Sequence, residues 1–357
     1  MTVSHLARRG IETMKEGGAA TKIEVGSSWL AGLLVVTVLA LFFILFSIEY
    51  TYSLLVPTLA VVEDSNPDLY LRVDNDTASK PPGDPIDSEM EVETPAPKPI
   101  TSKLRTTIRH LRARAGRLSR FRGFSMFLTC AIAESFLSSL APVSSSSIIG
   151  RFIVQMTVAV LLANLQVAWV HIVISEPSPK RFYSRIPSFR SLSKIVPAAA
   201  FEHLLVNGAF FGTLFVIRLF HGINELDLVR NGDGASPDAY GNAAGITSIA
   251  AFVSWLASFP ARVIFIRVAA SMLPEEDEAI VPFDRSFGGK RTPSVLGGGV
   301  LSIADAWNTF DRDGWKRYVK ALLKATALQI GVVMLFSLAF TAEILGGALV
   351  FKDGKKD

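Results

Sequence analysis

Long apolar stretches, separated by strongly charged segments, dominate the pattern of hydrophobic and polar positions along this chain. No charged residue occurs in 25–48 or in 152–175. Four other stretches are similarly apolar but keep one or more ionisable residues: 123–150, 195–220, 239–267 and 325–351. A helix rises about 1.5 Å per residue, so roughly 20 apolar residues cross the hydrocarbon core of a bilayer. The pattern predicts an all-α, polytopic membrane protein with about six transmembrane helices.

The same pattern divides the chain into membrane and polar segments. In chain order we expect a polar tail at 1–24, a first transmembrane segment at 25–60, a disordered acidic and proline-rich loop at 61–100, a basic amphipathic interfacial helix at 101–122, a membrane bundle of four spans at 123–273, a loop with a short amphipathic helix at 274–320, a last transmembrane segment at 321–351 and a polar tail at 352–357. In the 274–320 loop, Ser302 followed by Asp305 resembles a capping box and predicts the start of the short helix.

Charge changes sign sharply between the first and second spans. The stretch 63–93 holds ten acidic residues against Arg72 and Lys80, and several prolines interrupt it. Such a composition buries too little apolar surface to offset the entropy of ordering, which predicts disorder. Protein partners are expected to bind through this 61–100 loop.

The stretch 98–122 holds nine Lys or Arg residues and no acidic residue. Apolar residues recur within it at spacings of four, three, four and three, which places them on one face of a helix. These residues are Leu104, Ile108, Leu111, Ala115 and Leu118. A helix of this kind lies in the membrane interface, with its apolar face below the headgroups and its cations against anionic lipid.

Anionic phospholipid headgroups are therefore the predicted partner of this helix, and each cation near such a surface contributes about 1 kcal/mol. The candidate lipid contacts are Lys103, Arg105, Arg109, Arg112, Arg114 and Arg117. A solvated basic tail that never becomes ordered is the alternative. A peptide covering 101–119 should become helical on anionic vesicles but not on zwitterionic ones.

Composition agrees with a membrane protein and excludes several function classes. Half of the residues are hydrophobic, 19% are charged and the mean hydropathy is +0.37, whereas soluble domains carry nearer a quarter charged residues. The net charge of +4 does not indicate nucleic acid, because the basic residues cluster beside apolar segments, and the most basic stretch, 98–122, has no interleaved aromatic residue before Phe121. One cysteine, Cys130, excludes an intramolecular disulfide.

Sequence signatures of catalysis and of metal binding are missing. The Gly289-Lys290 pair is not part of a phosphate loop, because Asp284 and Arg291 stand where glycine and a hydroxyl residue are required. The histidines occur singly, without the spacing of a metal site. The sequence therefore predicts no cofactor, no metal, no catalytic residue and no enzymatic activity.

The stretch from Pro274 to Lys290 (PEEDEAIVPFDRSFGGK), followed by Asp305 to Phe310 (DAWNTF), resembles a family of fungal multi-pass membrane proteins. Some members of that family carry the label ubiquitin carrier protein, and the resemblance covers most of the chain through the layout of spans. Ubiquitin conjugation requires a reachable catalytic cysteine beside a His-Pro-Asn turn. This chain has no such turn, and Cys130 lies in an apolar stretch, so the residues do not support the label.

Ionisable residues inside spans indicate function by default, or else partnered charges that fix helix packing. Matching residues by expected depth predicts two intramembrane pairs, Glu134 with Arg262 and Glu202 with Arg267. Arginines that reach the interface along their own side chains are the alternative.

Two functions remain open from the sequence. The first is a non-catalytic membrane component that organises lipid or protein partners, and the second is a small-solute or ion transporter or channel that uses Glu134 and Arg262. Acidic residues interleave with the basic ones in 1–24, which argues against a mitochondrial presequence and favours a eukaryotic endomembrane or plasma membrane. The basic loops 98–122, 180–194 and 285–320 are expected in the cytosol, and Asn75 of the sequon Asn75-Asp76-Thr77 should then stay unglycosylated.

Overall fold

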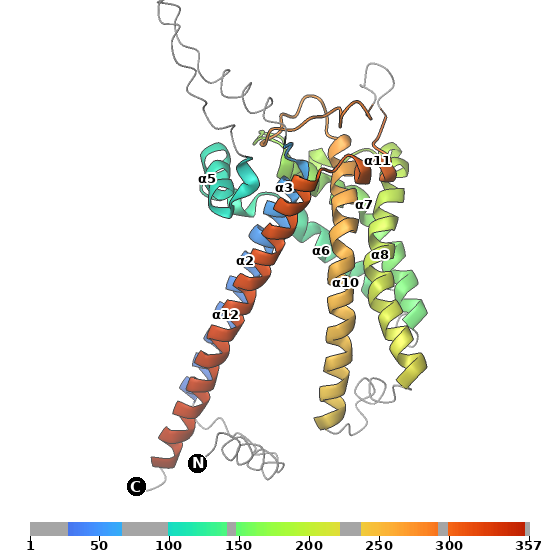
Figure 1. Ribbon diagram of the computed structural model, residues 1–357. Coiled ribbons are helices and arrows are strands. Elements are labelled where there is room, and N and C mark those ends of the chain that lie inside the picture. The colour runs from blue at the N-terminus through green and yellow to red at the C-terminus, as the bar shows by residue number, and fades with distance from the viewer. Residues whose placement is uncertain (1–27, 66–98, 141–147, 222–236, 292–298, 354–357) are drawn as a thin grey trace, which may run out of the picture. The chain divides into compact units, whose positions relative to one another are not determined.

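A computed structural model describes residues 28–65, 99–140, 148–221, 237–291 and 299–353 (Figure 1). The secondary structure of these residues consists of helices and one isolated bridge, between Ser175 and Ala279. The sequon at Asn75 and most of the 61–100 loop lie outside the described residues. The chain is an all-α polytopic membrane protein, as predicted.

Five helical stretches among the described residues are long and apolar enough to cross a membrane. They are Ala31–Val62, Ile149–Ile174, Ser191–Phe220, Asp238–Ser271 and Arg312–Gly346. The sixth predicted span corresponds to α6 (Phe124–Ser139), which has 16 residues and is therefore about 24 Å long. That length is shorter than a hydrocarbon core of about 30 Å, so helix length supports five of the six predicted spans.

The first span is a continuous helical stretch with a widened middle. It consists of α2 (Ser28–Ile48), a π-helical segment η1 (Glu49–Leu55) and α3 (Val56–Val62). Pro57 lies just after the π-helical segment and has no N–H to donate to the preceding turn. A π-helical turn is a common way for a helix to accommodate such a missing hydrogen bond.

The chain forms two compact units. The smaller comprises Met1–Ser47 with Ala327–Asp357, and the larger comprises Ile48–Thr326. In the smaller unit α2 and the later part of α12 (Arg312–Asp353) run side by side (Figure 1). Thr37 of α2 donates a hydrogen bond of 2.6 Å to Glu343 of α12, so a polar contact joins two otherwise apolar helices.

The larger unit is built on α7 (Ile148–Ile174), α8 (Phe189–His221) and α10 (Pro237–Ser271). Ser254 of α10 donates to the carbonyl of Val206 on α8 at 2.9 Å, and His171 of α7 contacts the carbonyl of Ala269 on α10 at 2.8 Å. These contacts, with the chain order, make α8 antiparallel to both α7 and α10 (Figure 1). Two-thirds of the most apolar window of α7 is buried (67%), so α7 is the central helix of this unit.

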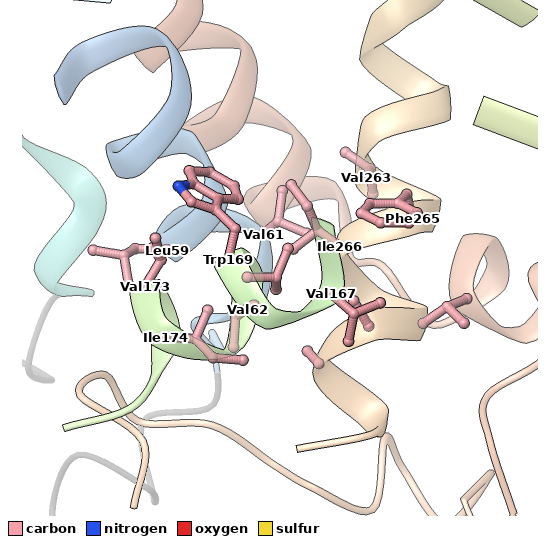
Figure 2. Packing of buried hydrophobic residues seen from close by; sticks show 14 of the residues in the cluster. Leu59, Val61, Val62, Val167, Trp169, Val173, Ile174, Val263, Phe265 and Ile266 are labelled. Atoms are coloured by element: carbon pink, nitrogen blue, oxygen red, sulfur yellow. The ribbon is translucent and has the colours of Figure 1, made fainter. Parts of the chain in front are cut away.

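A dense hydrophobic cluster closes one end of the larger unit. Figure 2 shows Val61 and Val62 of α3 packed with Val173 of α7 and Ile266 of α10. The segment after α10 extends this cluster by backbone hydrogen bonds, because Ile280 N donates to the carbonyl of Ile174 at 2.8 Å and Asp64 N donates to that of Pro282 at 3.0 Å. The cluster therefore fixes the connecting segments at the end where the candidate sites lie.

The same end carries several short helices. They are η2 (Ile100–Ser102), α5 (Leu104–Ala115), η3 (Ser119–Phe121), η4 (Phe182–Arg185) and α11 (Ile303–Asn308). Ser302, the predicted N-cap, accepts a hydrogen bond from Asp305 N at 3.0 Å at the start of α11.

The apolar face of α5 packs on protein, which corrects the prediction that it dips into lipid. Leu111 is fully buried in the hydrophobic cluster of the larger unit, Leu104 and Ala115 pack against that cluster, and Ile108 is 9% exposed. Leu118, the last member of the predicted stripe, falls beyond the helix and is 79% exposed. The buried apolar residues of α5 therefore pack on other parts of this chain and not on lipid.

Candidate functional site

A buried ion pair joins the three central helices. Arg262 of α10 donates from Nη1 to Oε1 of Glu202 on α8 at 2.8 Å. The guanidinium group also lies 5.6 Å from the ring centre of Trp169 on α7, within the range of a cation–π interaction. The Glu202 side chain is 7% exposed and that of Arg262 is 31% exposed, so the carboxylate is the enclosed member of the pair.

Helix register explains why Glu202 binds Arg262 and not Arg267, its predicted partner. Ser254 of α10 lies beside Val206 of α8. In an antiparallel pair, moving one turn back along α8 to Glu202 corresponds to moving one turn forward along α10, to Ser258. Arg262 lies one further turn from Ser258, within reach of its long side chain, whereas Arg267 lies more than two turns away.

Glu134, the predicted partner of Arg262, borders this cluster without pairing with it. It is an exposed residue of α6, and the ion pair that the described residues form at Arg262 goes to Glu202. The depth argument therefore included both members of the observed pair, Glu202 and Arg262, but assigned each of them a different partner.

Arg267 instead joins the ends of several elements. Its guanidinium donates to the hydroxyl of Thr309 at 2.8 Å and to the carbonyl of Val61 at 3.4 Å. It also lies 4.9 Å from the ring centre of Phe287 and 5.2 Å from that of Phe310. Backbone carbonyls and aromatic faces thus surround a residue that is only 8% exposed.

A cavity of about 590 Å³ lies beside Arg267. Its polar lining includes Asp64, Asp284, Asp311 and Lys290. No group of three or more His, Cys, Asp or Glu side chains in the described part of the chain is placed to hold a metal ion. The cavity therefore mixes both signs of charge.

Hydrogen bonds continue from the ion pair toward the end of α7. Trp169 Nε1 donates to the hydroxyl of Tyr50 at 3.3 Å, and that hydroxyl donates to the carbonyl of Arg122 at 2.5 Å. The Arg122 side chain in turn donates to the carbonyls of Ile172 and Ser175. It thereby satisfies orphan carbonyls at the end of α7, where a positive charge is also favoured. Burial lowers the pKa of Arg122 to about 10, so it stays charged at neutral pH.

The basic helix α5 presents a second candidate site on the surface. His110 contacts the carbonyl of Ile280 at 2.8 Å, and Arg114 forms an ion pair of 3.1 Å with Glu176. These contacts and the buried Leu111 hold one face of α5 against the bundle. All six candidate lipid contacts, Lys103, Arg105, Arg109, Arg112, Arg114 and Arg117, are exposed. We call these six residues the cationic face.

Glu63 fixes the start of α5 relative to the end of α3. Its carboxylate accepts hydrogen bonds from Ile100 N at 2.6 Å, from Thr101 N at 2.9 Å and from the Thr101 hydroxyl. Arg317 of α12 donates to the Glu63 carbonyl at 3.0 Å and to Ser65 at 2.7 Å. The two described ends of the 66–98 segment are therefore tied to one point of the larger unit.

Comparison of the chain with known protein families and with curated proteins found no match. The candidate sites are therefore identified from the geometry of the structure. Sequence analysis missed Trp169, Tyr50 and Arg122, because an apolar context makes an aromatic residue indistinguishable from packing. Arg122 carries one detectable signal, its position as the last cation before an apolar stretch.

Proposed function

We propose that this integral membrane protein is a non-catalytic component that organises anionic lipid at one face of the membrane. The cationic face of α5 is the observation that carries the proposal. Its helix is held by Leu111, by His110 and by the ion pair of Arg114 with Glu176, so the other cations are oriented before any lipid binds. Preorganisation lowers the entropy lost on binding, and each cation near an anionic surface contributes about 1 kcal/mol.

Lipid selectivity of the reconstituted full-length protein tests this function. Spin-labelled phosphatidylserine and phosphatidylcholine report which headgroup is enriched beside the protein. We expect phosphatidylserine to be enriched for the native chain, and the triple variant Arg105→Gln, Arg109→Gln, Arg112→Gln to lose most of that preference. A matched variant, Arg181→Gln, Lys290→Gln, Lys320→Gln, removes the same charge from other exposed residues and should keep it. Equal losses in both variants would exclude α5 as the site.

The intramembrane ion pair favours a second candidate function, a small-solute or ion transporter. Ionisable residues in spans mark transport paths in many membrane proteins, and Glu202 and Arg262 lie within two of the five long helices. A solute-flux assay in vesicles, with Glu134→Gln and Arg262→Gln as variants, tests it. Flux that is present in the native protein and abolished by either variant, without loss of folded protein, would favour transport over lipid organisation.

A further inference from the structure

A cavity of about 710 Å³ lies between the start of α8 and the end of α10. Its lining comes from three elements: Lys194, Pro197 and Ala198 of α8, Val268 of α10, and the segment 299–304, which includes the start of α11. Ala198, Val268 and Leu301 belong to the hydrophobic cluster of the larger unit. Leu301 N also donates a hydrogen bond of 3.1 Å to the Ser271 hydroxyl at the end of α10. The walls of this cavity are therefore fixed parts of the larger unit.

The lining is apolar apart from two side chains. Ser302 is one of them, and its hydroxyl is already engaged, because it donates to Asp305 Oδ2 at 2.7 Å and accepts from Asp305 N at 3.0 Å. Lys194 is the other, and it is exposed. None of the described residues that line the cavity is acidic. A ligand with an apolar body and a negatively charged group suits such a lining.

The cavity lies near the ends of two membrane spans. Lys194 is three residues into the span Ser191–Phe220, and Val268 is three residues from the end of Asp238–Ser271. Three residues of helix rise about 4.5 Å, so both residues lie close to the boundary between hydrocarbon and headgroups. Pro197 and Ala304 are exposed, and none of the most apolar window of α8 is buried (0%). In a bilayer the cavity therefore opens at the level of lipid.

Lipid suits this cavity better than water does. An apolar cavity offers water too few hydrogen bonds and stays dry, whereas an acyl chain gains close packing contacts there. Cavities of about 300–1,000 Å³ enclose most of a drug-sized ligand, so this one has room for part of a lipid molecule. A lipid phosphate lies at the depth of Lys194, and an ammonium group binds phosphate through charge-assisted hydrogen bonds.

We propose that this cavity binds one phospholipid of the bilayer, with an acyl chain against Ala198 and Val268 and the phosphate at Lys194. The site differs from the cationic face of α5, which offers charge alone, because it selects an acyl chain and a phosphate together. The inference requires that the chain is an integral membrane protein, and it does not depend on lipid binding at α5.

Photocrosslinking of the reconstituted full-length protein tests this site. Two probes carry the same photoreactive acyl chain: phosphatidylglycerol, and diacylglycerol, which lacks the phosphate. We expect phosphatidylglycerol to label residues 194–198 and 299–304, located by mass spectrometry, about fivefold more than diacylglycerol does. Phe42 of α2, which is 68% exposed, is the reference for bulk lipid and should react equally with both probes. Absence of label from the cavity, or equal labelling of it by the two probes, would overturn the proposal, and this result requires no variant to fold.

Two matched variants test the phosphate contact. Lys194→Gln should abolish the preference for phosphatidylglycerol at the cavity, whereas Lys320→Gln, at an exposed residue outside the lining, should keep it. A preference that survives Lys194→Gln would also overturn the proposal.

The triple variant of α5, Arg105→Gln, Arg109→Gln, Arg112→Gln, separates this site from the cationic face. Its cavity should be labelled as in the native chain, even though its general preference for anionic lipid is lost. Loss of cavity labelling in this variant would show that the cavity is not an independent site.

Discussion

Glu202 and Arg262 illustrate how a single ion pair fixes helices in a bilayer. Each residue alone would leave an uncompensated charge among apolar side chains, which costs about 3–5 kcal/mol in buried pairs. Together they join α8 to α10 at 2.8 Å, and Trp169 on α7 contacts the same guanidinium. The pair specifies one register of α8 against α10.

Neutralising one partner should therefore be worse than neutralising both. We expect Glu202→Gln and Arg262→Gln each to reduce the yield of folded protein and its thermal midpoint. The double variant should recover part of the loss, with a coupling of about 1–3 kcal/mol. Size-exclusion yield and thermal unfolding in detergent measure the effect. Glu134→Gln, at an exposed position of α6, is the control, and additive single effects would show that the pair is not coupled.

The Asp284 carboxylate accepts backbone hydrogen bonds in a turn where Phe287 has a left-handed conformation, at φ 50°. Partial burial opposes its ionisation, but hydrogen bonds from Gly288 and Ser286 outweigh burial and lower its pKa below the usual value. A lowered pKa means that the turn is fully stabilised above pH about 4 and loses this stabilisation as the pH falls through the folded value.

Asp284→Asn should accordingly lower stability at neutral pH by about 1–2 kcal/mol. The difference between native chain and variant should shrink below pH 4, because the native carboxylate is then protonated as well. Thermal unfolding from pH 7 to pH 3 measures it. Asp313→Asn provides the comparison, since Asp313 is 71% exposed in a surface ion pair and contributes little. A difference that stays constant with pH would contradict the role of the charge.

At the scale of elements, the sequence of α5 predicts its helical periodicity but not the partner of its apolar face. Periodicity predicted a helix over 101–122, and α5 covers part of that stretch; Ile108 and Leu111 of the stripe are buried, whereas Leu118 lies beyond the helix. It could not predict the partner, because an apolar face fits lipid and protein equally well by composition. His110 contacts the carbonyl of Ile280, 170 positions later in the chain, and no local pattern encodes such a long-range contact.

The docking of α5 should depend on Leu111. Leu111→Ala removes a fully buried side chain, which typically costs about 2–5 kcal/mol, and should release α5 from the bundle. Hydrogen exchange of the amides in 104–115 should then rise strongly while exchange in α7 changes little. Leu118→Ala, at a residue that is 79% exposed, should leave exchange unchanged. If the amides of 104–115 are equally protected from exchange in both variants, residues other than Leu111 hold α5 against the bundle.

At the scale of the whole molecule, apolar length supports five of the six predicted spans. The segments containing Arg114, Glu176 and Ile280 touch one another in the larger unit, so α5 and the connections that follow α7 and α10 meet at one end of it. The pairing of charges was predicted less well. The depth expected for a residue carries an error of several residues, and each residue along a helix points in a different direction, so a small error in depth changes the expected partner. The hydrogen bond from the Ser254 hydroxyl to the carbonyl of Val206 supplies the register that the sequence lacks.

This arrangement gives the orientation a direct test. If the basic end faces the cytosol, Asn75 stays unglycosylated, because Glu63 and Thr101 on either side of its segment are fixed at that end. Asp233→Thr creates a sequon at Asn231 in the connection between α8 and α10, which leaves the opposite end. We expect a glycan on Asn231 in that variant, visible as a mobility shift removed by glycosidase. A glycan on Asn75 would reverse the orientation.

The hydrogen bonds of Glu63 have a consequence for how this chain tolerates change in length. The carboxylate joins the residues that flank the 66–98 segment, so contacts outside that segment hold its two ends together. Closure entropy grows only with the logarithm of loop length, so doubling the segment with a Gly-Ser insertion should cost about 0.6 kcal/mol. Glu63→Gln should cost more than the whole insertion. The molecule is thus free to lengthen or shorten this loop while one carboxylate keeps its two ends in place.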